Sequence, residues 1–299
     1  MMHSNLSINS FLKTAGLLLL CVFLISLLSA CQTVSVGTRD FIVSDADLLK
    51  RQQKVPEKSY TKLIEKLPSL AFESLGFDMI DGTRLSGIVY RHPNARGTVL
   101  LFGNNAFRVA QQGHVLIRAL KDYPVNIIQF DYRGYGNSGG EPSASLMKSD
   151  AIEVFDQVKT QFTGPIIVHG HSFGSFVASW LSTQRQLDGL VLEGAATSAE
   201  ELLRDMTPWY AKPFVRYEIE DALKEYDNRT FLKKFSNPFL ILVGEKDVMT
   251  APSHARQIFM SFDNSRKYMK VIAGADHMSA MHQVEASLAY KEFLTLVLD

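Results

Sequence analysis

Short apolar runs and longer amphipathic runs alternate along most of the chain. GTVLLFG precedes VAQQGHVLIRALKDY, VNIIQFD precedes SASLMKSDAIEVFDQVKTQF, and PIIVHG precedes SFGSFVASWLSTQ. The apolar runs DGLVLEG, PFLILVGE and KYMKVIAG follow, and a final helical spacing joins Met281, Val284, Leu288 and Phe293. Strand-like runs separated by amphipathic helices predict a mostly parallel sheet with helices on both faces, which is an α/β fold.

The start of this region predicts an antiparallel edge. AFESLGFDMI and TRLSGIVYRH flank Asp81-Gly82, a pair typical of hairpin turns. Residues 70–299 are therefore expected to form one α/β domain. An insertion at about 196–236, rich in aromatic and charged residues, is expected to form a small helical cap.

The first thirty residues have a different pattern. MMHSNLSINSFLK carries one Lys and no acid, TAGLLLLCVFLISLL is almost wholly apolar, and Leu-Ser-Ala-Cys follows. A basic start, an apolar middle too short to span a bilayer and a small-residue exit are typical of an export signal, here residues 1–30. An uncleaved signal anchor and a plain secretory signal are the alternatives.

The segment ending at Cys31 resembles the lipobox of bacterial lipoproteins. That resemblance implies a mature chain that starts at Cys31 and carries acyl chains on a membrane of the bacterial envelope. Gln32 after the cysteine, rather than Asp, implies the outer membrane. Residues 31–69 are polar, and they are expected to form a tether with short helices. Cys31 would be the sole cysteine of the mature chain, so no intrachain disulfide is expected.

Composition narrows the function classes. The chain has 46% hydrophobic and 21% charged residues, and its 31 basic residues are balanced by 31 acidic ones without massing. Nucleic-acid binding is therefore not expected. No H-E-x-x-H motif or cysteine cluster is present, so neither a metal nor an organic cofactor is expected.

The pattern G-x-S-x-G, which marks the nucleophile of many serine hydrolases, occurs twice. Ser172 in GHSFG follows a strand run and leads directly into a helix run, which is the strand–turn–helix geometry of a nucleophile elbow. Ser138 in GNSGG is followed by GGEPSAS, and this stretch cannot begin a helix at once. Ser172 is therefore the predicted nucleophile, and Ser138 is expected to belong to a structural loop.

A catalytic serine needs a base and an acid that orients the base. FLILVGEKD ends a strand run with Asp247, and KYMKVIAGADH ends the next with His277. Both are expected at the carboxyl-terminal edge of the sheet with Ser172, in the chain order Ser, Asp, His. Helix-capping roles for Asp247 and His277 are the alternative. Asp276, Glu245, His254 and His282 are less suitable candidates because of their neighbours or their helical context.

Two backbone N–H groups are expected to stabilise an oxyanion. One belongs to Phe173, directly after the nucleophile, and the other to Asn104, in the loop after GTVLLFG. In the alternative interpretation, the side chains of Asn104 and Asn105 only shape that loop.

Together GHSFG, DYRGYGNSGGEPS, LVLEGAATSAEEL, VGEKDVMTAPSHA and GADHMSAM resemble the α/β-hydrolase superfamily. The likeness is to its serine aminopeptidase-like and acyl-protein depalmitoylase-like branch, and it covers about residues 70–299. It implies the α/β-hydrolase fold, a Ser–Asp–His triad and a structural role for the Ser138 loop. The family usually has His-Gly-Asn where this chain has Phe102-Gly103-Asn104.

The expected function is that of an envelope-anchored serine hydrolase, held on the membrane through Cys31, that cleaves carboxylic esters or thioesters of a small-molecule or acyl-chain substrate. A peptidase or amidase with the same triad, and a non-catalytic hydrolase-like binding protein, are the alternatives. In the cap, Met206, Trp209, Tyr210, Phe214 and Tyr217 have three possible roles: lining an acyl pocket, facing a bilayer or packing the lid onto the sheet.

Overall fold

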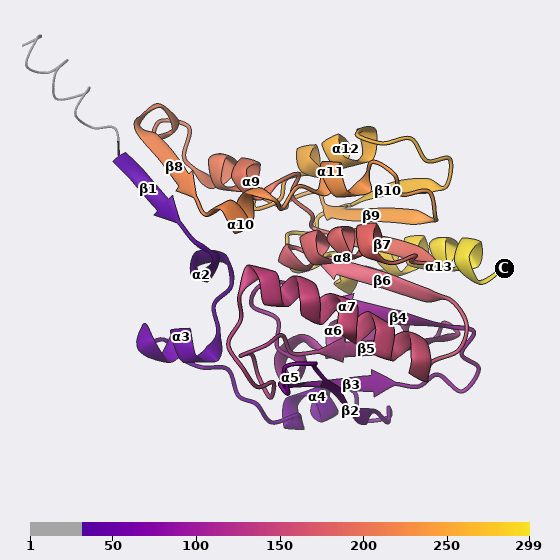
Figure 1. Cartoon of the computed structure of the whole chain (residues 1–299). Coiled ribbons are helices and arrows are strands. Elements are labelled where there is room, and N and C mark those ends of the chain that lie inside the picture. The colour runs from indigo at the N-terminus through magenta and orange to yellow at the C-terminus, as the bar shows by residue number, and fades with distance from the viewer. Residues whose placement is uncertain (1–31) are drawn as a thin grey trace, which may run out of the picture.

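The computed structural model describes residues 32–299, and this part of the chain contains an eight-stranded sheet flanked by helices (Figure 1). In spatial order the strands are β10 (Lys267–Ile272), β9 (Phe239–Gly244), β7 (Gly189–Glu193), β6 (Ile166–His171), β4 (Gly97–Phe102), β5 (Val125–Phe130), β3 (Arg84–Tyr90) and β2 (Glu73–Asp78).

Most neighbouring strands of this sheet run parallel, as the apolar pattern predicts. The antiparallel pairs are β2 with β3 and β3 with β5. The β2–β3 turn contains Asp81 and Gly82, and Gly82 has a φ of 82°, a left-handed conformation that suits glycine. The strands β4, β7 and β9, each of which has a neighbouring strand on both sides, are buried along their whole length, as expected of strands covered on both faces.

Helices cover both faces of the sheet. Along β4, Leu100 and Phe102 pack into one apolar core, while Val99 and Leu101 pack into the other. The first core is closed by α7 (Ala144–Gln161), α8 (Phe173–Gln184), α11 (Asn228–Leu232) and α12 (Pro252–Met260). The second is closed by α4 (Thr61–Lys66), α5 (Val109–Gln112), α6 (His114–Leu120), η2 (Ala280–His282) and α13 (Val284–Leu298). The predicted arrangement, a mostly parallel sheet with helices on both faces, is therefore present.

The cap differs from the helical unit that the sequence predicts. It contains α9 (Ala199–Met206), η1 (Lys212–Phe214) and α10 (Asp221–Lys224), but also the strand β8 (Val215–Ile219). This strand pairs in parallel with β1 (Gln32–Val36) to form a separate two-stranded sheet. Figure 1 shows the pair at one end of the molecule, away from the eight-stranded sheet.

The segment expected to be a tether is therefore partly built into the domain. It does contain short helices, namely α2 (Thr38–Phe41), α3 (Asp45–Lys50) and α4. Its first residues, however, form β1, and β1 is held by the cap. The tether interpretation is wrong for Gln32–Val36 because these residues find backbone hydrogen-bond partners in β8.

The leader and the predicted lipidation at Cys31 lie outside the described residues. Within residues 32–299 no helix has both the length and the apolar character needed to cross a bilayer.

Candidate active site

Ser172 lies in a sharp turn between β6 and α8, with a φ of 53° and a ψ of −117°. Among residues 32–299 the only other non-glycine residue with a positive φ is Gln52. A Cβ at Gly174 would collide with the backbone oxygen of Phe102, and one at Gly170 would lie 2.5 Å from the oxygen of Gly174. Both glycines are needed because the backbone segments approach closely, so the local sequence forces Ser172 into the strained conformation of a nucleophile elbow.

The structure brings Ser172, His277 and Asp247 together at the carboxyl-terminal edge of the sheet. His277 Nε2 lies 2.9 Å from Ser172 Oγ, and His277 Nδ1 lies 2.8 Å from Asp247 Oδ2. These distances are within the hydrogen-bonding range that a nucleophile, a base and an orienting acid require. Asp247 follows β9 and His277 follows β10, so strand ends position both residues.

Asp247 is held as a charged group. Its Oδ1 accepts the backbone N–H groups of Met249 and Thr250 at 2.9 and 2.8 Å, and its Oδ2 accepts the Thr250 hydroxyl at 2.7 Å. Burial acts to raise the pKa of Asp247, but the hydrogen bond and charge of His277, together with the hydrogen bonds from Thr250, bring the pKa below its usual range. Thr250 is a site residue that the sequence analysis missed. The only available signal was its position three residues after Asp247.

The loop after β4 is fixed by buried hydrogen bonds. The Asn104 side chain donates to Gln112 Oε1 at 2.9 Å, and its Oδ1 accepts the N–H of Ala106 at 2.8 Å. The Tyr132 hydroxyl donates to the backbone oxygen of Gly103 at 2.9 Å. Phe102 packs edge-on against Phe130, with 5.5 Å between the ring centroids. The loop after β4 is therefore braced by residues other than Phe102.

Two backbone N–H groups near Ser172 remain available as oxyanion donors. Among residues 32–299 neither Asn104 N–H nor Phe173 N–H has a hydrogen-bond acceptor. Phe173 begins α8, and the first N–H groups of a helix have no intrahelical partner. These are the two donors that the sequence analysis selected, and their catalytic role stays a prediction.

Ser138 lies in a loop without an adjacent base. Its hydroxyl donates to the backbone oxygen of Asp131 at 2.6 Å and accepts the N–H of Ser86 at 2.9 Å. The residue is buried and joins the β3 strand to the loop after β5. These contacts are those of a structural serine.

The other candidates for acid and base lie elsewhere. His254 Nδ1 contacts the Thr197 hydroxyl at 3.0 Å, and Asp276 accepts the Ser279 hydroxyl at 2.6 Å. Glu245 accepts the N–H of Gly274 at 2.9 Å, and His282 belongs to η2. None of these contacts involves Ser172.

An apolar cavity of about 390 Å³ opens at Ser172, within the range of about 300–1,000 Å³ typical of small-molecule sites. Its wall combines the elbow, the cap and the N-terminal strand. The lining includes Ser172, Phe173, Phe176, Leu202, Leu203, Met206, Tyr217, Val34, Val36 and Phe41. Met206 and Tyr217 thus line the pocket, as one interpretation of the cap aromatics predicts.

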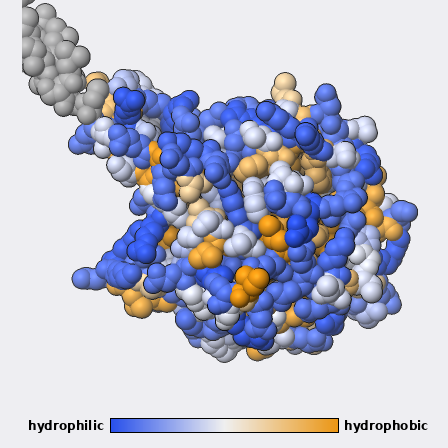
Figure 2. Space-filling model, viewed as in Figure 1, coloured by the Kyte–Doolittle hydropathy of each residue, from blue (hydrophilic) through white to orange (hydrophobic). Residues whose placement is uncertain are grey.

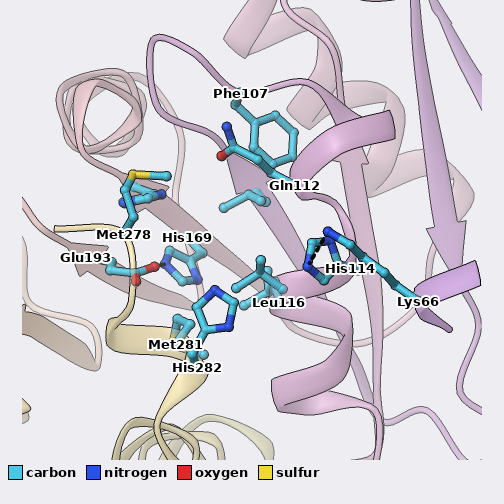
Figure 3. Close-up of a pocket in the computed structure, with 13 residues that line it drawn as sticks. Lys66, Phe107, Gln112, His114, Leu116, His169, Glu193, Met278, Met281 and His282 are labelled. Atoms are coloured by element: carbon cyan, nitrogen blue, oxygen red, sulfur yellow. Dashed lines mark hydrogen bonds and ion pairs between the residues drawn. The ribbon is translucent and has the colours of Figure 1, made fainter. Parts of the chain in front are cut away.

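A second cavity, of about 290 Å³, is bordered by Phe107 and Gln112 on one side and by Met278 and Met281 on the other (Figure 3). His169, Glu193, His282 and His114 border it, and Lys66 Nζ donates to His114 Nε2 at 3.2 Å. In its wall the His171 ring contacts the His277 ring at 5.7 Å, and His171 Nδ1 lies 3.3 Å from Asn104 Nδ2. Within the described chain no group of three His, Cys, Asp or Glu residues is arranged to hold a metal ion.

Comparison with known protein families agrees with this fold. Residues 94–227 match the family described as serine aminopeptidase, S33. The matched region contains Asn104 and Ser172 and ends before Asp247 and His277.

Curated relatives include an alpha/beta hydrolase domain-containing protein of Arabidopsis thaliana, 26% identical over 68% of this chain and 70% of that protein. Protein bem46 of Schizosaccharomyces pombe is 31% identical over 58% of this chain and 59% of its own length. A lysophosphatidylserine lipase of Xenopus tropicalis is 36% identical over 49% of this chain and 42% of that protein. The chain thus spans less than two thirds of the last two relatives.

Solved structures share the fold. An esterase of Pyrococcus furiosus superposes with a TM-score of 0.64 at 18% identity, over 82% of this chain and 98% of the esterase. A ferulic acid complex of Est1E from Butyrivibrio proteoclasticus gives a TM-score of 0.62 at 16% identity, over 74% and 98% of the two chains. At these identities the likeness concerns the fold.

The sheet order, the elbow and these similarities define the α/β-hydrolase fold. Within this fold, residues 94–227 resemble the serine aminopeptidase S33 family.

Proposed function

We propose that this protein is a serine hydrolase that cleaves carboxylic ester or thioester bonds through an acyl-Ser172 intermediate. The observation that carries the proposal is the hydrogen-bonded series from Ser172 Oγ to His277 to Asp247, beside an apolar cavity. The lysophosphatidylserine lipase among the relatives adds support for an acyl ester substrate.

In this mechanism His277 Nε2 takes the Ser172 proton while Oγ attacks the carbonyl carbon. The N–H groups of Asn104 and Phe173 bind the oxyanion of the tetrahedral intermediate. The intermediate collapses, the C–O or C–S bond breaks, and the leaving group receives the proton from His277. Water then attacks the acyl-enzyme by the same route, and the acid product leaves.

The two G-x-S-x-G serines provide a matched pair of variants. Ser172→Ala is expected to lower turnover of p-nitrophenyl acetate by roughly 10⁴–10⁶. Ser138→Ala is expected to keep most of the activity but to lose about 1–3 kcal/mol of stability, because the Asp131 oxygen and the Ser86 N–H lose their partner. Unchanged hydrolysis in Ser172→Ala would count decisively against the mechanism.

Two further assays separate the alternative functions. An ester and an amide of the same acyl group, compared by kcat/KM, distinguish esterase from amidase or peptidase action. A fluorophosphonate probe is expected to label wild-type protein and not Ser172→Ala. Absence of labelling in the wild type would favour a hydrolase-like binding protein.

We also propose that the protein is anchored to the bacterial envelope by lipid at Cys31, with the outer membrane as its location. The support is the leader sequence with Leu28-Ser29-Ala30-Cys31 at its end and Gln32 after it. Mass spectrometry of the mature N-terminal peptide is expected to find an acylated Cys31. An unmodified N-terminus at another residue would contradict the anchor.

A further inference from the structure

The tip of the cap, Met206–Phe214, exposes large apolar and aromatic side chains to solvent. Trp209 is 82% exposed, Tyr210 62% and Met206 54%. The Trp209 and Tyr210 rings contact each other edge-on, 5.9 Å between centroids, so they form one exposed aromatic unit. Figure 2 shows that the cap and β1 project from the main body of the molecule. Exposed aromatic side chains gathered on a projection are typical of an interaction surface.

The register of β1 relates this tip to the start of the described chain. Gln32 pairs with Val215, and Val215 directly follows Phe214 of the tip. The apolar run of the leader ends at Leu28, four residues before Gln32 (32 − 28). Four residues span at most about 14 Å of fully extended chain. A bilayer that holds this run, or an acyl group on Cys31, is therefore attached close to Phe214, at one end of the tip that carries Trp209 and Tyr210.

We propose that the cap tip inserts into the surface of the lipid bilayer to which the N-terminus is attached, and that the substrate is an acyl lipid of that bilayer. This inference rests on the proposed hydrolase function and on the proposed anchor. Trp and Tyr suit the boundary of a bilayer because each has an apolar ring and a polar group.

The pocket geometry connects the tip to the nucleophile. Met206, at the end of α9, and Val34, in β1, line the same cavity as Ser172. The tip begins at Met206, so the cap end of the cavity lies beside the proposed bilayer surface. An acyl chain that leaves the bilayer there follows an apolar wall to Ser172.

Charge contributes little to this surface. Between Ala199 and Lys224 the chain has six acidic and four basic residues. Lys212 is paired with Asp205 at 3.3 Å, and Arg204 with Glu200 at 2.9 Å. The surface therefore fits a zwitterionic lipid at least as well as an anionic one, and salt is expected to change the interaction only slightly.

The first experiment uses the two tryptophans of the chain, Trp180 and Trp209. The full chain is reconstituted into phosphatidylcholine vesicles that contain lipids brominated on their acyl chains. Bromolipid quenching of the tryptophan fluorescence is expected in the wild type and in Trp180→Phe, and it should disappear in Trp209→Phe. If Trp209 is quenched by aqueous acrylamide and not by bromolipid, the proposal is wrong. In that case the exposed unit faces water or a protein partner.

The second experiment compares two substrates, a long-chain acyl ester embedded in the vesicles and soluble p-nitrophenyl acetate. The double variant Trp209→Ala/Tyr210→Ala is expected to lower hydrolysis of the embedded ester about tenfold relative to the soluble one. Ile80→Ala, at a residue 94% exposed in the β2–β3 turn, is the matched control and should leave the ratio unchanged.

An unchanged ratio in the double variant would overturn the substrate part of the proposal. Failure of the wild type to hydrolyse either ester would instead contradict the proposed function. The fluorescence result is independent of hydrolysis, so the two failures are distinguishable.

Discussion

At the scale of single residues, the loop that carries Asn104 depends on a neighbour outside the triad. Gln112 accepts from Asn104 Nδ2 at 2.9 Å and donates to the backbone oxygen of Ala106 at 3.3 Å. It thus joins both sides of the loop that supplies one predicted oxyanion donor. Gln112 acts through Asn104, so it is a positioning residue.

Gln112→Ala is expected to lower kcat about tenfold with little change in KM, because a displaced donor weakens oxyanion binding in the transition state. Gln112→Glu keeps the acceptor for Asn104 and should retain most of the activity. Gln111→Ala is the control, since Gln111 contacts the backbone of Glu57 instead. An equal loss in both alanine variants, measured by steady-state kinetics, would mean a general effect on α5.

Asp247→Asn is expected to lower kcat by roughly 10⁴, because an amide cannot stabilise the imidazolium of His277. The wild-type pKa of Asp247 lies below its usual range, so its carboxylate is charged near neutral pH. Ionisation of Asp247 therefore adds no pH dependence near neutral pH. A variant that keeps more than about a tenth of wild-type kcat at pH 7 would remove Asp247 from the mechanism.

These residues also show what the sequence can predict about a site. Ser172, Asp247 and His277 each follow a strand, and the carboxyl ends of parallel strands meet at one edge. Their proximity was therefore predictable without coordinates. Thr250 and Gln112 were not predictable, because their contacts depend on how two loops fold back onto the sheet.

At the scale of elements, β1 is the part of the fold that most affects the proposed substrate. Among the strands of residues 32–299 it pairs with β8 alone, and it contributes Val34, Ser35 and Val36 to the wall of the pocket at Ser172. Four of its five residues are exposed, so few core contacts hold it. Its position depends mainly on the backbone hydrogen bonds to β8.

The Glu220 N–H donates to the backbone oxygen of Val36. Because alternate residues of a parallel strand face its partner, the Val34 N–H faces β8 and the Ser35 N–H faces away. Val34→Pro removes that N–H, so the pairing with β8 should weaken and the pocket should lose part of its apolar wall. We expect kcat/KM for p-nitrophenyl octanoate to fall about tenfold, equivalent to the lost burial of about two methylene groups, while the acetate ester is hydrolysed as before. Ser35→Pro, which leaves the β8-facing N–H groups in place, is the control, and equal effects of both variants would contradict the role of β1.

The sequence predicts the elements of the main sheet well and this pair poorly. Strands such as β4 and β9 are continuous apolar runs, and such runs identify buried strands. β1 has the mixed sequence QTVSV, and its partner β8 lies far along the chain, inside a segment rich in helix-forming residues. Local patterns contain no signal for such a distant pairing.

At the scale of the whole molecule, the cavity of Figure 3 affects stability through His114. Burial, followed by the positive charge of Lys66, lowers the pKa of His114 to about 4 from an ordinary value of 6.5. The folded state thus favours the neutral ring. The stability from this residue is complete above pH 6.5 and is lost as the pH falls towards 4.

Urea unfolding of the full chain in detergent is expected to show this loss as about 2 kcal/mol between pH 7 and pH 4.5. The value is below the full conversion of the pKa shift, because water in the open cavity screens part of the effect. His114→Gln cannot titrate but can still accept from Lys66, so its unfolding free energy should change less over this pH range. If the unfolding free energies of the two proteins fall equally between pH 7 and pH 4.5, groups other than His114 cause the acid sensitivity.

The position of β1 in the chain has a mechanical consequence. A pull on the polypeptide ahead of Gln32 acts first on the β1–β8 hydrogen bonds, and it reaches the eight-stranded sheet through β8 and along the chain that follows β1. We expect the small sheet to yield before the large one, so that one side of the pocket opens while Ser172, Asp247 and His277 keep their arrangement. Tension at the N-terminus would then widen the pocket before it unfolds the domain.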